Sequence, residues 1–242
     1  MRERKGIILF LLLSFCVFPQ GLKIVDLTPK GSSNNPFDVL EIEFNQEINE
    51  SSFTVEDIVF TGPGGNIVPS NITKISGTKY QIISTGQTGL QNYTIEIGPD
   101  IENMQGTKMD VSFKAGLFGT LKTIDEANAD YENFAIVCYK STLTINGSHT
   151  FYFLKLLDNS VCTHSPCTDS SVYMIDLNIS GDVYIDATSK IDVSGRGYIK
   201  GYTKGNSPTG ASGNAGGSYG GLGKGDTTNW VYGDYKNPEY PG

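Results

Sequence analysis

Residues 173–193 read YMIDLNISGDVYIDATSKIDV, and this stretch decides the fold class. Its odd positions are mostly apolar, whereas its even positions from 176 onwards are almost wholly polar. Successive side chains of a strand point to opposite faces, so the pattern predicts a β-surface with one buried and one wet side. The stretch is too long for one strand, because strands rarely exceed about 10 residues. We therefore expect bends at residues 180–182 and near 188–189, with the same face kept inside. A β-solenoid bends in this way, and so does a meander within a sandwich.

The composition agrees with an all-β protein. Of the 242 residues, 29 are Gly, 13 are Tyr and 12 are Phe, and long amphipathic helical windows are absent. Many short strands separated by glycine-rich turns account for such a composition.

The N-terminus has the features of an export signal. Three basic residues, Arg2, Arg4 and Lys5, precede an apolar run over residues 7–18. That run fits the core of a signal peptide and is too short to span a bilayer, which takes about 20 residues. We assign residues 1–20 to a signal peptide and expect a secreted or cell-surface protein. No second long apolar run follows, so no membrane span is expected after the signal is removed.

The net charge argues against a nucleic-acid partner. The formal charge of the whole chain is −8, and it becomes −10 when residues 1–20, with three basic residues and one acidic residue, are removed. An acidic surface repels phosphate backbones.

The cysteines predict one bridge. Cys162 and Cys167 flank the sequence Thr-His-Ser-Pro, and an exported protein can close such a loop with a disulfide. The alternatives are free thiols and a metal site, but His164 with these two cysteines supplies too few ligands for the usual tetrahedral zinc site.

The first folded unit is expected over residues 22–115. Short apolar segments recur every 8–15 residues between Gly, Pro and Asn turns, which predicts a β-sandwich. We place strands at residues 22–27, 39–44, 57–60, 80–83, 93–97 and 111–113.

Four phrases of this unit resemble the bacterial Ig-like domains of S-layer and other large surface proteins. They are IVDLTPKG, LEIEFNQEINESSFTVEDIVFTGPGG, ISGTKYQI and YTIEIGPDIENMQGTKMD. The resemblance covers most of residues 22–113, and it implies a spacer or adhesion module with no active site.

Three acidic residues of the first unit stand at turns: Asp57, Asp100 and Asp110. They are candidates for a Ca²⁺ site, which takes six to eight oxygens from a close cluster. The alternative is that they are ordinary turn residues, because Asp favours turns through its own side-chain hydrogen bonds. No other cofactor is expected.

The second unit is expected over residues 116–242. Apolar segments such as FAIVCY at 134–139 alternate with turns at intervals of about 10–20 residues, within the range of solenoid rungs. The phrases STLTINGSHTFYFLKLLDNSVCTHS, DLNISGDVYIDATSKIDVSGRGY and GNAGGSYGGLGKG resemble the beginning of secreted bacterial right-handed β-helix proteins, which are associated with surfaces and adhesion. The fold class expected is therefore all-β, an Ig-like sandwich followed by the first rungs of a β-solenoid. Because no terminal cap follows the glycine-rich region, we expect this unit to be incomplete, the N-terminal piece of a longer protein.

A glycine-rich loop holds the aromatic candidates for ligand contact. Residues 195–225 contain 12 glycines, which by itself indicates a flexible loop. Tyrosines and the single tryptophan are spaced through and after it, and such side chains combine an apolar face with a polar edge. They either stack on sugars of an extracellular polysaccharide or pack on the solenoid itself: Tyr198, Tyr202, Tyr219, Trp230 and Tyr232.

Four aspartates lie on the polar face of the opening stretch: Asp176, Asp182, Asp186 and Asp192. Outward carboxylates on neighbouring rungs serve as acid and base in solenoid enzymes, but exposed strand positions are polar in any case. No Lys, Arg or His cluster accompanies them, so no catalytic residue is expected. We favour a non-catalytic adhesion or structural role at the cell surface. The alternatives are the N-terminal part of a polysaccharide lyase or glycoside hydrolase, and a carbohydrate-binding accessory module.

Overall fold

The computed structural model describes residues 21–84 and 89–211, and then residues 216, 217, 219, 221, 223, 224, 231, 233, 234 and 236. Within these residues the chain forms strands and turns and contains no α-helix. The helical elements of the described part are single 3₁₀ turns: η1 (Pro36–Asp38), η2 (Glu50–Ser52), η3 (Val55–Asp57) and η4 (Lys204–Asn206).

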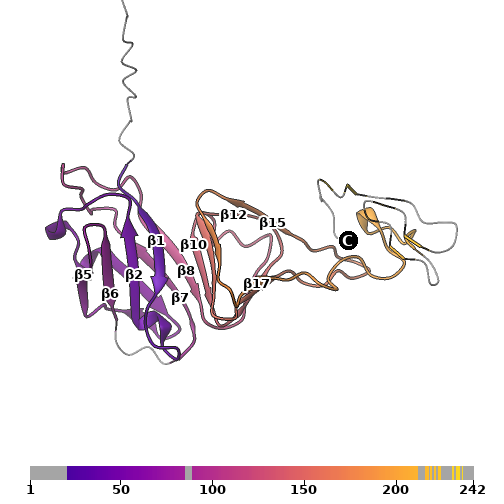
Figure 1. Cartoon of the computed structure of the whole chain (residues 1–242), viewed down its shortest axis with the longest axis horizontal. Helices are drawn as coiled ribbons and strands as arrows, with labels where there is room; N and C mark the ends of the chain where they lie inside the picture. The colour runs from indigo at the N-terminus through magenta and orange to yellow at the C-terminus, as the bar shows by residue number, and fades with distance from the viewer. Residues whose placement is uncertain are drawn as a thin grey trace, which may run out of the picture.

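Two antiparallel sheets form the first unit (Figure 1). One has the strand order β1-β2-β6-β5, with β1 (Ile24–Pro29), β2 (Val39–Phe44), β5 (Asn71–Lys74) and β6 (Lys79–Ile83). The other begins β4-β3-β7-β8, with β3 (Ile58–Gly62), β4 (Gly65–Ile67), β7 (Asn92–Ile97) and β8 (Phe113–Phe118). Every second residue of β2 and β7 is buried, as the sequence alternation predicts. The buried side chains of both sheets join in one core, in which Phe44, Phe53 and Tyr80 meet edge to face with ring centroids 5.7–5.8 Å apart.

The second unit consists of three parallel ladders. Ladder 1 is β8-β10-β13-β16, with β10 (Ala135–Tyr139), β13 (Phe153–Leu157) and β16 (Val183–Ile185). Ladder 2 is β9-β11-β14-β17, with β9 (Lys122–Ile124), β11 (Thr142–Ile145), β14 (Val161–Thr163) and β17 (Lys190–Ile191). Ladder 3 is β12-β15, with β12 (Gly147–Phe151) and β15 (Ile175–Ile179). The chain visits the ladders in turn, so that β10, β11 and β12 form one pass and β13, β14 and β15 the next.

The two units share a strand. β8 pairs with β7 in antiparallel fashion on one side and with β10 in parallel fashion on the other, so a single seven-stranded sheet runs from β4 to β16. The division expected after residue 115 falls inside β8.

β10, in the middle of ladder 1, has two dry faces. On β10, Val137 belongs to the core of the first unit, whereas its neighbour Ile136 belongs to a second core enclosed by the ladders. Both side chains are fully buried. A strand covered on both faces is apolar along its whole length. This explains why residues 134–139 form an unbroken apolar run.

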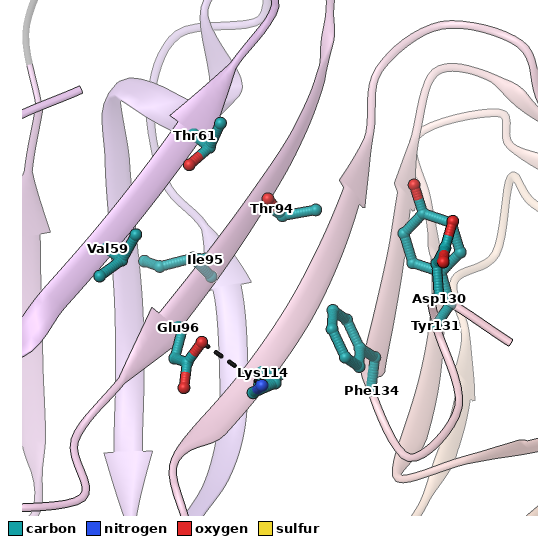
Figure 2. Close-up of a pocket in the computed structure, with 9 residues that line it drawn as sticks. All are labelled: Val59, Thr61, Thr94, Ile95, Glu96, Lys114, Asp130, Tyr131 and Phe134. Carbon is teal, nitrogen blue, oxygen red and sulfur yellow. Dashed lines mark ion pairs between the residues drawn. The ribbon is translucent and has the colours of Figure 1, made fainter. Parts of the chain in front are cut away.

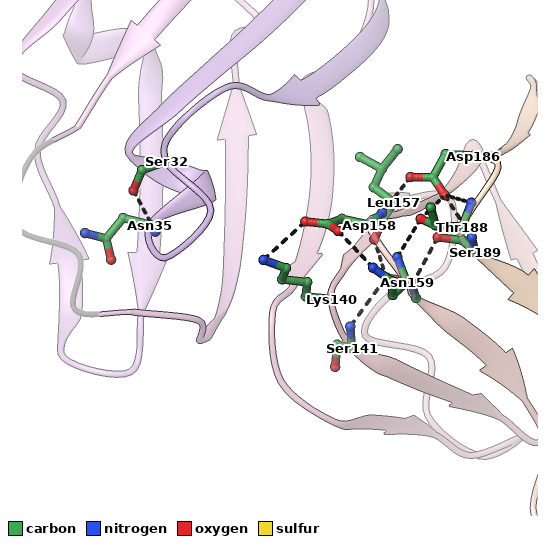
Figure 3. Close-up of polar contacts among 11 residues, drawn as sticks. Ser32, Asn35, Lys140, Ser141, Leu157, Asp158, Asn159, Asp186, Thr188 and Ser189 are labelled. Carbon is green, nitrogen blue, oxygen red and sulfur yellow. Dashed lines mark hydrogen bonds and ion pairs between the residues drawn. The ribbon is translucent and has the colours of Figure 1, made fainter.

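A polar corner lies where each pass turns from ladder 1 to ladder 2 (Figure 3). Asp158 and Asn159 have left-handed backbone conformations there, with φ of 52° and 65°, and these residue types tolerate that region better than most. Backbone amides donate to side-chain oxygens one pass later: Asp158 to Asp186 (2.6 Å), Asn159 to Thr188 (2.9 Å) and Ser160 to Ser189 (3.0 Å). Side chains thus join the turns of these two passes, in addition to the backbone bonds from the Asp186 amide to the Leu156 carbonyl (3.1 Å) and from the Lys190 amide to the Ser160 carbonyl (3.0 Å).

The last strands differ from the expectation of a shared dry interior. Ile175, Leu177 and Ile179 are half-buried, but Val183 and Ile191 are 51% and 46% exposed. The alternation of apolar and polar residues is present, but the expected burial of Val183 and Ile191 is wrong. The reason is that, among the described strands, β16 pairs only with β13 and β17 only with β14. Within the described part of the chain, no further strand covers the side chains that face inward on β16 and β17.

Candidate functional site

A groove lies on the outer face of the seven-stranded sheet, at the border between the two units (Figure 2). We call it the sheet-face groove, and its volume is about 320 Å³. Its lining comes from β3, β7, β8 and the loop before β10: Val59, Thr61, Thr94, Ile95, Glu96, Lys114, Asp130, Tyr131 and Phe134.

Strand register sets the polar floor of the groove. Alternation buries Ile58, Phe60 and Ile97, so the intervening side chains of β3 and β7 point outward. Two rows then cross the sheet: Val59 faces Glu96, which faces Lys114, and Thr61 faces Thr94, which faces Gly116. The Glu96 and Lys114 side chains form an ion pair with an N–O distance of 3.4 Å.

An aromatic wall closes one side. In the first pass no third-ladder strand follows β9 in the described chain, and the loop of residues 125–134 leads directly to β10. The Tyr131 ring lies edge to face against Phe118, at 5.4 Å between centroids, and against Phe134, at 5.8 Å. Lys122 Nζ lies 4.6 Å from the centroid of the Tyr131 ring. A Cβ on Gly116 would come within 2.8 Å of the Phe118 ring and 3.3 Å of the Tyr131 ring, so glycine makes room for this wall.

The groove has the chemistry of a binding surface. It combines apolar ring and methyl surface with hydroxyl, carboxylate and ammonium groups. Its lining residues include no histidine, cysteine or serine.

A smaller cavity of about 130 Å³ contains the groups that most resemble a catalytic set. It is lined by Glu132, Ser148, His149, Thr150, Asp176 and Asn178. His149 Nδ1 lies 2.7 Å from Glu132 Oε1, and the imidazole is almost fully buried. Ser148 and His149 are neighbours on β12, so they point to opposite faces of the strand. The Ser148 hydroxyl instead donates to Asp176 Oδ2 at 2.5 Å. A serine activated by this histidine is therefore not formed.

The three metal candidates are not brought together. Asp57 accepts hydrogen bonds from the Thr54 amide at 2.7 Å and the Thr54 hydroxyl at 3.0 Å, at the start of η3. Asp100 pairs with Lys108 at 2.8 Å. A Cβ on Gly21 would meet the carboxylate of Asp110, which places that group beside the start of the described chain. Across the described residues there is no group of three or more His, Cys, Asp or Glu side chains suited to a metal ion.

The predicted disulfide is not formed. Cys162 and Cys167 are free buried thiols, and so is Cys138. Cys162 points into the core between the ladders, whereas the sulfur of Cys167 accepts a hydrogen bond from the Tyr173 amide at 3.3 Å. Burial raises the pKa of Cys138 to about 11 and that of Cys162 to about 12.

The aromatic ligand candidates fall on two parts of the chain. Tyr198, Tyr202 and Tyr219 are half-buried, and a Cβ on Gly233 would meet the Tyr219 ring at 2.5 Å. Trp230 and Tyr232 lie outside the described residues. None of the three described tyrosines lines the sheet-face groove or the His149 cavity.

The acidic row of the opening stretch is engaged in local bonds. Asp186 Oδ1 accepts from the Thr188 and Ser189 amides at 2.9 and 2.8 Å, and its other oxygen accepts from Asp158. Burial would raise the pKa of Asp186, but these hydrogen bonds outweigh burial and hold the pKa below its ordinary value. Asp192 accepts from Lys190 Nζ at 2.7 Å and the Ser194 amide at 3.0 Å, which lowers its pKa as well. The geometry supports a turn-stabilising role for both aspartates.

Sequence reasoning missed the sheet-face groove because its parts are far apart in the chain. Thr61 and Thr94 carry no signal beyond strand alternation, and Tyr131 lies in the polar segment of residues 125–133, DEANADYEN. The one usable signal was the pairing of two aromatic residues, Tyr131 and Phe134, just before an apolar strand.

Comparisons with known proteins give distant structural likenesses. No protein-family model matches the chain, and no curated protein is similar to it in sequence. Over 39% of its length the chain resembles the N-terminal part of the bacterial S-layer protein SbsC, with a TM-score of 0.34, 11% identity and 23% of that chain covered. Over 40% it resembles a structure of SbsC domains 1–6, with a TM-score of 0.30, 11% identity and 13% of that chain covered. The chain thus spans less than a quarter of each of these two S-layer structures. In the described part, no helix has the length and hydropathy needed to cross a membrane.

Proposed function

We propose that this chain is a non-catalytic structural or adhesion protein that is exported to the cell surface or beyond. In this proposal the first unit is an Ig-like sandwich, and the three parallel ladders are the first coils of a β-solenoid. The observation that carries the proposal is the uninterrupted seven-stranded sheet from β4 to β16.

A shared sheet makes a stiff connection between the units. Independent domains are joined by flexible linkers and move relative to one another by default. Here no linker intervenes, because β8 is hydrogen-bonded to both units. A second tie crosses the junction, where Lys155 on β13 forms an ion pair with Asp26 on β1 and donates to the Thr28 hydroxyl at 2.8 Å. A stiff connection between the two units suits a spacer that holds another molecule at a fixed distance from the cell surface.

The absence of an enzymatic role is supported by the use of the polar groups. Asp186 caps a turn, Asp192 pairs with Lys190, and His149 is paired with Glu132 in the interior. These contacts give Asp186, Asp192 and His149 a part in the fold, which supports a structural role.

Expression of the full chain in a bacterial host tests the proposal. We expect the protein in the medium or accessible to protease on intact cells, with residues 1–20 missing from its intact mass. Small-angle X-ray scattering of the purified protein should give one particle of fixed elongated shape. Retention inside the cell with residues 1–20 in place would contradict the export. Release of reducing or unsaturated sugars from polysaccharides would favour the enzymatic alternative.

A further inference from the structure

We propose that the sheet-face groove binds a short segment of a neutral oligosaccharide. This goes beyond the structural role, and it places ligand binding at Phe134, Thr94 and Asp130 rather than at the tyrosines of the glycine-rich loop.

The lining matches the two-sided chemistry of a sugar ring. A pyranose presents C–H bonds on its faces and hydroxyl groups around its edge. Phe134 and the 56% exposed Val59 offer apolar contact on two sides of the groove. Thr94 offers a hydroxyl and Asp130 a carboxylate, and no hydrogen bond within the described chain uses either group. Sugars are bound by this combination of an aromatic surface and polar partners at the rim.

The size of the groove sets the length of the ligand. Small-molecule sites have volumes of roughly 300–1,000 Å³, and the sheet-face groove, at about 320 Å³, is at the lower end. It therefore holds a short part of a chain.

The charge of the lining excludes acidic ligands. Glu96 and Lys114 compensate each other, which leaves the carboxylate of Asp130 as the unbalanced charge among the lining residues. The whole chain is also acidic, with a formal charge of −8. A uronic-acid polymer or a phosphate-bearing polymer would be repelled, whereas a neutral glycan would not.

The strand pairing excludes an extended peptide bound by strand addition. That mode needs a free sheet edge. β3 pairs with β4 and β7, β7 with β3 and β8, and β8 with β7 and β10. The strands of the groove thus offer side chains on a sheet face and no free sheet edge.

Titration of the full secreted chain with neutral tetrasaccharides tests the inference. The probes are cellotetraose, maltotetraose, mannotetraose and chitotetraose, with tetragalacturonate as the charged comparison, and binding is followed by calorimetry. We expect at least one neutral probe to bind and the charged probe to bind at least tenfold more weakly. No binding of any neutral probe, or preference for tetragalacturonate, would overturn the inference.

Three variants locate the site. Thr94→Val removes a hydroxyl at constant shape, Asp130→Asn removes the charge, and Phe134→Ala removes the aromatic wall. Each should weaken binding by about 3–10-fold or more, the range expected for an aromatic contact or a hydrogen bond. Because Phe134 also packs against the core between the ladders, Phe134→Ala could weaken binding by destabilising the fold. Thr94→Val does not touch that core, so it tests binding separately from stability.

Tyr202→Ala is the matched control and should bind like the unchanged chain. Loss of binding in Tyr202→Ala with none in Thr94→Val and Asp130→Asn would place the site in the loop and refute the groove. If the protein is stiff and exported but binds no glycan, only this inference fails and the structural proposal remains.

Discussion

Two adjacent side chains on β10 make the coupling of the units measurable. Ile136 faces the core between the ladders and Val137 faces the core of the first unit, and both are fully buried. If the seven-stranded sheet unites the two cores, Ile136→Ala and Val137→Ala must each destabilise the whole molecule.

The magnitudes follow from the buried groups. An Ile→Ala change in a core costs about 2–5 kcal/mol, including the cavity that it leaves. Val→Ala removes the equivalent of two methylenes at about 0.8 kcal/mol each, and with a cavity term the cost is about 2–3 kcal/mol. For a chain of this size, a loss of about 3 kcal/mol lowers the melting temperature by about 6–12 °C. Val111→Ala, at a site that is 74% exposed, is the control and should change stability by less than about 0.5 kcal/mol.

Native-state hydrogen exchange, read by mass spectrometry, shows whether the two units unfold together or separately. With one cooperative unit, Ile136→Ala lowers the protection of amides in β2 of the first unit as much as that of amides in β11 of the second. The reasoning is refuted if Ile136→Ala leaves β2 unchanged, or if calorimetry resolves two transitions that the two variants shift separately.

Three further results are expected. The pKa of Asp186 lies below its usual 3.8, so its contribution to stability is complete above about pH 4 and is lost as the pH falls. In denaturant titrations, Asp186→Asn should make the free energy of unfolding fall less steeply as the pH is lowered. An unchanged pH dependence would count against the hydrogen bonds of the polar corner. The raised pKa values of Cys138 and Cys162, about 11 and 12, leave little thiolate at pH 8. Labelling of the folded protein with iodoacetamide should therefore be slow, and it should become rapid in denaturant. Rapid labelling of the folded protein would show that the core between the ladders is open. Gly147 has a φ of 84°, and a Cβ there would come within 2.6 Å of a neighbouring glutamate, so Gly147→Ala should cost about 1–3 kcal/mol of stability. Gly64 has open space around it, so Gly64→Ala is the control and should be nearly neutral. Equal effects of the two substitutions would contradict this geometry.

The sequence predicted strands better than it predicted burial. Alternation is local, so the strands around Ile42, Ile95 and Ile175 could be placed from residue types alone. The unbroken apolar run at residues 134–139 has a physical cause in the two dry faces of β10, and this could be recognised only once both covering cores were known. The exposure of Val183 and Ile191 depends on which strand pairs next, and residue type carries no information on that point.

The candidate site was the least predictable part. Polarity identified Asp186 correctly as an outward residue, but its partner Asp158 is 28 residues earlier and the bond depends on the stacking of two turns. The sheet-face groove joins Thr61 to Tyr131, residues separated by 70 positions, through three strand pairings. Aromatic composition drew attention to the glycine-rich loop, whereas the groove uses an aromatic pair from a short junction.

The parallel stacking of successive passes is the central claim, and a cross-link tests it most directly. Thr150 on β12 lies opposite Asn178 on β15. Neighbouring strands are about 4.8 Å apart, within the Cα range of a disulfide, whereas a position two residues out of register is about 8 Å away and outside it. The account predicts that Thr150→Cys with Asn178→Cys forms a disulfide under mild oxidation of the folded protein, and that Thr150→Cys with Asp176→Cys does not. No cross-link in the first pair, or equal cross-linking in both pairs, would contradict the parallel register on which the fold and the proposed surface role depend.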